Sequence, residues 1–308
     1  MPSLLDKRLV VVTGKGGVGK TTVAAALGLA AARLGKRTVV CEVSEQERLA
    51  GMFGRSPLGH EEGVLAPGLF GISVVPERAK EEWLRRQLRS GALAGVLGHS
   101  RIFNLLTAAA PGLNELVTIG KVWDLAQLER RLGGSAYDLA ILDAPATGHS
   151  VAMLRAPRTF ANVAAGGPIH RQAMMIHDFL ADPKSTGVLA VALPEEMPVN
   201  ETLDLGERLR GEMGMEMDSI VVNALLPERF STQEAERMAA LDGKPSNAVR
   251  AALAAALTEH RRARAQRSQL RRLRRETDVP VTTLPYLFEP DLGTDALDRL
   301  SRELERRL

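Results

Sequence analysis

The chain has 308 residues, of which 45% are hydrophobic and 25% are charged, and its formal net charge at pH 7 is +3. This composition is that of an ordinary globular protein, and the length allows one large α/β domain or two small ones. Its single cysteine, Cys41, excludes an internal disulfide and a multi-cysteine zinc site within one chain. Because no apolar run is long enough to cross a bilayer and residues 1–8 lack a signal-peptide layout, we expect a cytoplasmic protein.

Short apolar runs alternate with longer helical patterns, which predicts parallel strands covered by helices on both faces. The expected strands span residues 9–13, 38–43, 71–75, 139–143, 188–193, 219–223 and 281–284. Two stretches, 79–133 and 151–183, interrupt the alternation and are interpreted as helical insertions. The predicted fold is a doubly wound, mostly parallel α/β sheet with helical insertions, in a single domain over residues 1–308.

A glycine-rich turn joins the first expected strand to a helix over residues 20–34. The turn consists of Gly14, Lys15, Gly16, Gly17, Val18, Gly19, Lys20 and Thr21. Its G-x-x-x-x-G-K-T spacing is that of a P-loop, in which backbone amides and a helix N-terminus bind phosphate groups. We expect Lys20 to contact the β and γ phosphates, the Thr21 hydroxyl to bind Mg²⁺, and Thr22 to adjoin the nucleotide. The motif predicts ATP and Mg²⁺ as ligands.

A second group of candidate residues follows the strand expected over residues 139–143. That strand ends in Asp143, and an apolar strand ending in aspartate is typical of a carboxylate that binds Mg²⁺, usually through water. The segment after it, residues 144–149, has the composition of a turn. We expect it to order around the γ-phosphate as switch loops do.

Lys15 is not required by the general P-loop motif, and it adds positive charge at the start of the loop. At this point the sequence resembles the deviant-P-loop ATPases, in which the corresponding lysine reaches across a dimer to the partner's nucleotide. That resemblance implies a catalytic contact by Lys15 and two chains facing each other across two ATP molecules.

Residues 111–115 and 194–202 narrow the resemblance from the deviant-P-loop ATPases to one family among them. The chain is similar to the family of arsenical-pump ATPases and ATPases that target tail-anchored membrane proteins, from Leu9 to about Leu287, in single-copy form. In that family a Val-Asn-x-Leu segment and a late Leu-Pro turn flank the adenine, which implies this role for Asn223 and Pro285. The implied partners are a second copy or a paralogous ATPase, and a hydrophobic protein client or a membrane.

The family's water-positioning aspartate is replaced here by Ser44. A serine hydroxyl cannot accept a proton as a carboxylate does, so hydrolysis depends on Glu42 or Glu45 as a substitute. The leading interpretation is an energy-coupling or targeting ATPase. The alternatives are a positioning ATPase that moves on DNA or membrane, and a nucleotide-binding regulatory subunit of a heterodimer without turnover of its own.

Two further stretches have both a structural and a functional interpretation. Residues 174–180 are rich in apolar side chains; a helix facing the core is favoured over a client groove. Residues 261–275 are rich in arginine, with leucines at helical spacing, which favours a helix with one packed stripe and one solvated face. The alternative is contact with an acidic partner or an anionic membrane; nucleic acid is disfavoured because no aromatic residue lies between the arginines.

Overall fold

The structure is a computed structural model that describes residues 4–43, 46–89, 112–127, 136–164, 166–241, 246–289 and 291–307. The strands are β1 (Leu9–Thr13), β2 (Thr38–Glu42), β3 (Gly63–Ala66), β4 (Leu69–Ser73), β5 (Leu139–Asp143), β6 (Thr186–Ala192), β7 (Ser219–Leu225) and β8 (Val281–Pro285). These form one sheet in the order β3-β4-β2-β5-β1-β6-β7-β8. Its pairs are parallel except for β3 with β4. This confirms the predicted α/β class.

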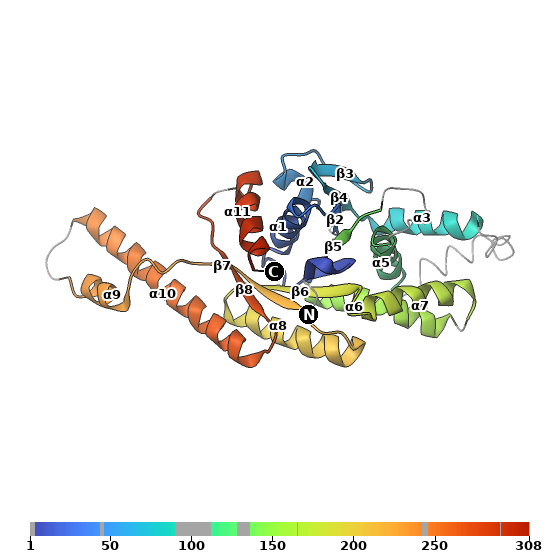
Figure 1. The fold of residues 1–308 in the computed structure, drawn as a ribbon. Helices are drawn as coiled ribbons and strands as arrows, with labels where there is room; N and C mark the ends of the chain where they lie inside the picture. The colour runs from blue at the N-terminus through green and yellow to red at the C-terminus, as the bar shows by residue number, and fades with distance from the viewer. Residues whose placement is uncertain are drawn as a thin grey trace.

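Helices connect the strands and cover the sheet (Figure 1). They are α1 (Lys20–Arg33), α2 (Leu49–Met52), α3 (Pro76–Arg89), α5 (Leu113–Leu125), α6 (Thr147–Val163), α7 (Gly167–Ala181), α8 (Glu196–Arg208), α9 (Thr232–Ala239), α10 (Asn247–Glu276) and α11 (Thr294–Glu305), with a 3-10 turn at Leu4–Asp6 and a π-helical turn at Leu209–Met213. The two stretches expected to be insertions are helical over most of their described length. Residues 90–111 and 128–135 lie outside the described residues.

The sheet has a separate core on each face because its strands alternate. In β1, Leu9 and Val11 belong to the core shared with α5, α6, α7, α8 and α10, while Val10 and Val12 belong to the core shared with α1 and α11. All four side chains are fully buried. The central strand is therefore apolar on both faces, as parallel strands covered on both sides require.

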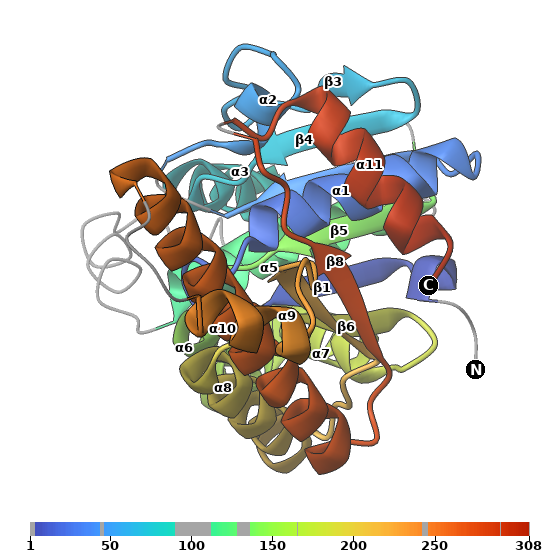
Figure 2. The same cartoon turned by 90° about the vertical axis from the view of Figure 1, so that its left-hand side faces the viewer.

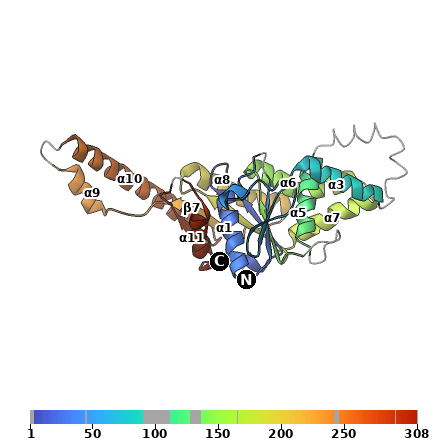
Figure 3. The same ribbon diagram turned by 90° about the horizontal axis from the view of Figure 1, so that it is seen from above.

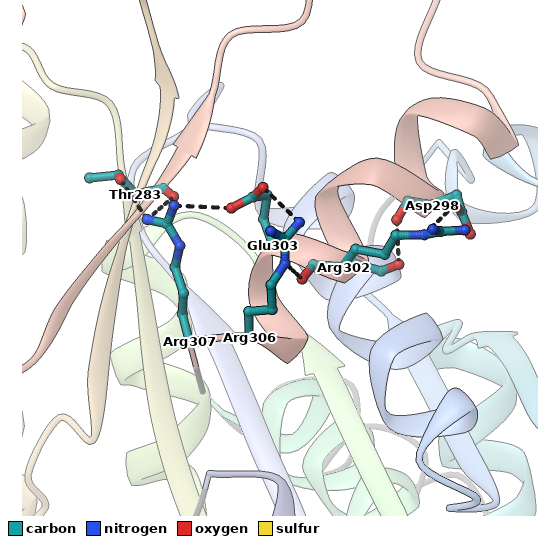
Figure 4. A network of polar contacts seen from close by, with 7 residues as sticks. Thr283, Asp298, Arg302, Glu303, Arg306 and Arg307 are labelled. Atoms are coloured by element: carbon teal, nitrogen blue, oxygen red, sulfur yellow. Dashed lines mark hydrogen bonds and ion pairs between the residues drawn. The ribbon is translucent and has the colours of Figure 1, made fainter.

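Helix α11 is tied to the rest of its layer by polar contacts as well as apolar ones. Arg33 of α1 forms an ion pair with Asp298 and donates a hydrogen bond to Ser301. At the other end of α11, the Arg307 guanidinium donates to the carbonyl and hydroxyl oxygens of Thr283 in β8, and Glu303 accepts from Arg307 (Figure 4). The contacts of Arg33 hold α11 against α1, the helix that begins at the P-loop, and those of Arg307 hold its C-terminal end against β8.

The strand prediction was wrong at the sheet edge. β3 was not predicted, and β4 begins at Leu69 rather than at residue 71, because residues 63–73 form an antiparallel hairpin around Pro67 and Gly68. A Pro-Gly pair is a turn signal that marks such a hairpin. Other boundaries shift by one or two residues; β7, for example, continues past Asn223 to Leu225.

The helices α9 and α10 form a hairpin that projects from one end of the molecule, opposite the layer of α3, α5 and α7 (Figures 1 and 3). In α10, Leu270 and Leu273 are buried and Leu257 is half-buried. The packed stripe predicted for the arginine-rich stretch is confirmed. Within the described ranges, no helix is long and apolar enough to cross a membrane.

Candidate nucleotide site

The P-loop lies between the carboxyl end of β1 and the first turn of α1, where it meets two neighbouring strands. Gly14 and Gly19 both have positive φ, at 148° and 91°. A Cβ on Gly14 would lie 2.2 Å from the Val191 carbonyl oxygen, and a Cβ on Gly19 would lie 2.3 Å from Asn223 Nδ2. Only glycine fits both the conformation and the close contacts, so the loop stays close to β6 and β7.

The first turn of α1 presents its polar groups to the phosphate site. Its N-cap, Gly19, has no side chain to cap the first amides, which leaves them available to an anion. Lys20 Nζ donates to the Lys15 carbonyl oxygen at 3.1 Å, so its side chain curls back over the loop. Burial lowers the pKa of Lys20, opposed by the charge of Asp143. Thr22 follows in the same turn and is half-buried.

Thr21 and Asp143, the two residues predicted to bind Mg²⁺, lie together in the structure. The Thr21 hydroxyl donates to Asp143 Oδ2 at 2.6 Å. The other carboxylate oxygen, Oδ1, is buried and has no hydrogen-bond partner among the described residues. A buried acceptor without a partner is costly unless a ligand, ion or water satisfies it. The hydroxyl and this oxygen therefore fit Mg²⁺ and its water shell.

The electrostatics of Asp143 follow from its burial. Burial raises its pKa to about 7; the hydrogen bond from Thr21 and the charge of Lys20 oppose that rise, while the charge of Glu42 adds to it. A divalent cation next to the carboxylate would favour its ionised form.

Glu42 lies beside Asp143, since the two are register partners in the β2–β5 pair. Its side chain is fully buried, and its carboxylate accepts from the backbone N–H of Arg48 at 3.0 and 3.1 Å and of Leu49 at 3.1 Å. Burial raises the pKa of Glu42, opposed by these backbone hydrogen bonds. In this arrangement Glu42 holds the segment that leads into α2. Ser44 and Glu45 lie outside the described residues.

Lys15 forms an ion pair with Glu201 of α8, a contact that the sequence did not predict. Both side chains are about one-third exposed, at 31% and 36%. The pair joins residues that are far apart in the sequence, so no local pattern could have identified it, although Glu201 belongs to the stretch 194–202 that carried part of the resemblance.

The structure brings Asn223 to the P-loop. Its Nδ2 donates to the Val18 carbonyl oxygen at 3.0 Å, while its Oδ1 accepts from the backbone N–H of Ala224 at 2.9 Å. Pro285 ends β8 opposite Leu225, so it lies on the adjacent strand and is exposed. Both residues lie near the carboxyl ends of the adjacent strands β7 and β8. Their contact with adenine stays a prediction.

The turn after Asp143 forms the start of α6 and contributes one more polar group to this region. The Thr147 hydroxyl is buried and has no hydrogen-bond partner among the described residues, and Ser150 Oγ lies 2.7 Å from Thr13 Oγ1 at the end of β1.

Cys41 is buried in β2 as expected. Within the described part of the chain, no cluster of three or more His, Cys, Asp or Glu side chains could hold a metal ion.

A mostly parallel sheet with a P-loop after its central strand and an aspartate at the end of the neighbouring strand defines a P-loop nucleotide-binding fold. A family model described as anion-transporting ATPase matches residues 7–166 and 168–250. The chain therefore belongs to the anion-transporting ATPase family, which confirms the resemblance and, at the level of the family, the ATPase class.

Several relatives share most of this chain. It is 31% identical over 237 residues to the ATPase BagA of Mycobacterium tuberculosis, an alignment covering 75% of this chain and 69% of the relative. It is 26% identical over 282 residues to the ATPase GET3C of Arabidopsis thaliana, covering 75% and 70%. A putative arsenical pump-driving ATPase of Halobacterium salinarum is 26% identical over 312 residues, covering 95% of this chain and 43% of the relative.

Proposed function

We propose that the chain binds ATP with Mg²⁺, associates with a second copy or a related subunit in the ATP-bound state, and uses this switch to deliver a hydrophobic client or engage a membrane partner. The observation that carries the proposal is the hydrogen-bonded Thr21–Asp143 pair beside a P-loop with two lysines, Lys15 and Lys20. Thr21 and Asp143 would hold Mg²⁺, which supplies neutralising charge to the phosphates.

Each lysine has a different place in this proposal. Lys20 curls over its own loop and would bind the phosphates of its own nucleotide. Lys15 is directed to Glu201 on α8, so it must leave that ion pair before it can reach a nucleotide held by a second chain. An ion pair that is one-third exposed is partly screened by water, which makes it weak enough for a phosphate to displace it. This arrangement allows ATP to be bound before the chains associate.

The experiment is to measure molecular mass and phosphate release together, with ATP and with ADP. We expect the molecular mass to double with ATP but not with ADP. Lys15→Ala should abolish this doubling while the variant still binds ATP. Lys184→Ala is the matched control, because Lys184 is an exposed lysine outside the loop. If the protein remains monomeric with ATP and associates with no paralogous subunit, the proposed dimer is wrong.

A second candidate is a nucleotide-binding subunit without turnover. It is favoured by the engagement of Glu42, whose carboxylate is occupied by the backbone of Arg48 and Leu49. Glu42 and Glu45 therefore stay predictions as substitutes for the family's aspartate. Tight ATP binding without phosphate release would establish this candidate, whereas release that is lost in Glu45→Gln would exclude it. Location in the cytoplasm and the single-domain organisation also stay predictions.

A further inference from the structure

The projecting α9–α10 hairpin contains a basic hollow that nucleotide binding does not explain. It lies between α10 and the segment that joins β7 to α9, has a volume of about 630 Å³, and is open to solvent. We call it the arginine hollow. Its lining includes Glu228, Ser231, His260, Arg264, Arg267 and Arg271.

The basic side chains form one face of α10. Positions 260, 264, 267 and 271 recur every three or four residues, so at 3.6 residues per turn they align along the wall of the hollow. Arg264 and Arg271 are exposed, and neither has an ion-pair partner among the described residues. They are separated by about 10.5 Å along the helix axis, since each residue rises about 1.5 Å. The wall thus offers two charges that the rest of the described chain does not neutralise.

The third arginine shows which ligand chemistry the hollow accepts. Arg267 Nε pairs with Glu228 Oε1 at 3.0 Å, so one carboxylate is already bound at the middle of the wall. Glu228 is 61% exposed, which makes this pair weak and exchangeable. Two other polar side chains are engaged within the chain: His260 Nδ1 donates to the Phe230 carbonyl oxygen, and Ser231 caps α9. Arg264 and Arg271 remain for carboxylates from outside.

We propose that the arginine hollow is a docking site for an acidic peptide segment of a partner protein. Guanidinium groups arranged along a helix bind carboxylates with directed hydrogen bonds. A flat bilayer does not match a concave site, and the aromatic side chain of Phe230 in the lining is half-buried, whereas single-stranded nucleic acid stacks its bases on exposed aromatic rings. This inference does not depend on the proposed function, because no residue of the hollow belongs to the nucleotide site.

Hydrogen bonds connect the hollow to the P-loop. Arg267 Nη1 donates to the Leu226 carbonyl oxygen at 3.0 Å, and the neighbouring Gln266 Oε1 accepts from the Leu226 N–H at 2.8 Å. Leu226 is three residues after Asn223, whose amide donates to Val18 in the loop. A segment bound at Arg264 and Arg271 would lie on both sides of Arg267 and would therefore act on the strand end that contacts the nucleotide site; coupling between the two sites is reciprocal.

The test measures fluorescence anisotropy of a labelled peptide in which glutamate alternates with glycine, against the same peptide with glutamine in place of glutamate. We expect the glutamate peptide to bind at low salt, and Arg264→Gln with Arg271→Gln to weaken it about tenfold, since each exposed ion pair contributes a few-fold. The control is Arg261→Gln with Arg262→Gln, which removes the same charge from exposed positions of α10 outside the hollow. The control should change affinity less than about twofold.

Equal weakening in the two double variants, or equal binding of the two peptides, would overturn the proposal, because diffuse charge or the peptide backbone would then account for binding. It is also overturned if anionic phospholipid vesicles or DNA bind through Arg264 and Arg271 while the glutamate peptide does not. The coupling has its own readout: saturating glutamate peptide should change the affinity for a fluorescent ATP analogue. If the peptide binds and the affinity for the ATP analogue is unchanged, the docking site is supported and the proposed coupling to the nucleotide site is wrong.

Discussion

Three glycines of the P-loop differ in why a larger residue would destabilise the protein: through its backbone conformation, through a close contact, or not at all. Gly16 has neither a positive φ nor an atom within 4 Å of the place a Cβ would take, Gly17 has φ +83° with open space around it, and Gly19 has φ +91° with Asn223 Nδ2 only 2.3 Å from that place. Alanine at these positions should therefore give three graded effects on the free energy of unfolding of the nucleotide-free protein.

The magnitudes follow from these contacts. Gly16→Ala should change stability by less than about 0.5 kcal/mol, as surface substitutions do. Gly17→Ala should cost about 1–2 kcal/mol, the strain of a left-handed conformation with a Cβ. Gly19→Ala should cost about 2–3 kcal/mol, because the Asn223 amide must also leave Val18 and lose a hydrogen bond worth about 1 kcal/mol.

Urea unfolding followed by tryptophan fluorescence measures these differences. In an Asn223→Ala background the close contact is removed, so the cost of Gly19→Ala should fall to that of Gly17→Ala. If Gly19→Ala costs the same in both backgrounds, the loop is not held by packing against Asn223, and the reasoning is refuted.

Three other perturbations test the site and the helical layer. Glu201→Gln should strengthen ATP-driven association, measured by light scattering, about two- to fivefold, since it frees Lys15 from a partly exposed ion pair; an unchanged affinity would show that Lys15 does not contribute to the contact between chains. Burial opposes ionisation of Glu82, but hydrogen bonds from His60 and Lys121 lower its pKa to about 2. Glu82→Gln should cost about 1–2 kcal/mol at pH 7, and the difference should shrink as pH falls from 4.5 toward 2, because the depressed pKa stabilises the fold only while Glu82 is ionised; a pH-independent difference would contradict this. EDTA should weaken ATP binding about tenfold in the wild type but little in Asp143→Asn, and equal weakening in both would place Mg²⁺ elsewhere.

The sequence predicted the central strands and the P-loop because both depend on local patterns. A short apolar run such as residues 139–143 predicts a strand that is covered on both faces. The glycine and lysine spacing from Gly14 to Thr21 predicts a P-loop between a strand and a helix. The edge strand β3 was missed because it is short and only Leu65 is buried, so it shows no clear alternation.

The side-chain partners in the site were harder to predict, because they depend on contacts between distant segments. Nothing near Lys15 in the sequence indicates Glu201, and the hydrogen bonds that engage Glu42 depend on how residues 46–49 turn toward β2. The arginine-rich stretch showed its buried leucines in the sequence. Its hollow depends on residues of the β7–α9 segment, which the sequence does not place, and on the position of α9 beside α10 (Figure 2).

Ala224 combines a side chain with a left-handed backbone, at φ 55°, at the residue that follows Asn223. Its N–H binds Asn223 Oδ1, which leaves the amide nitrogen to face Val18. These two backbone partners, a donor at Ala224 and an acceptor at Val18, together select one of the two flip states of the Asn223 amide. An aspartate at position 223 would still accept from the Ala224 N–H but could not donate to the Val18 carbonyl oxygen. The orientation of this side chain and its hydrogen bond to the P-loop can therefore be changed separately.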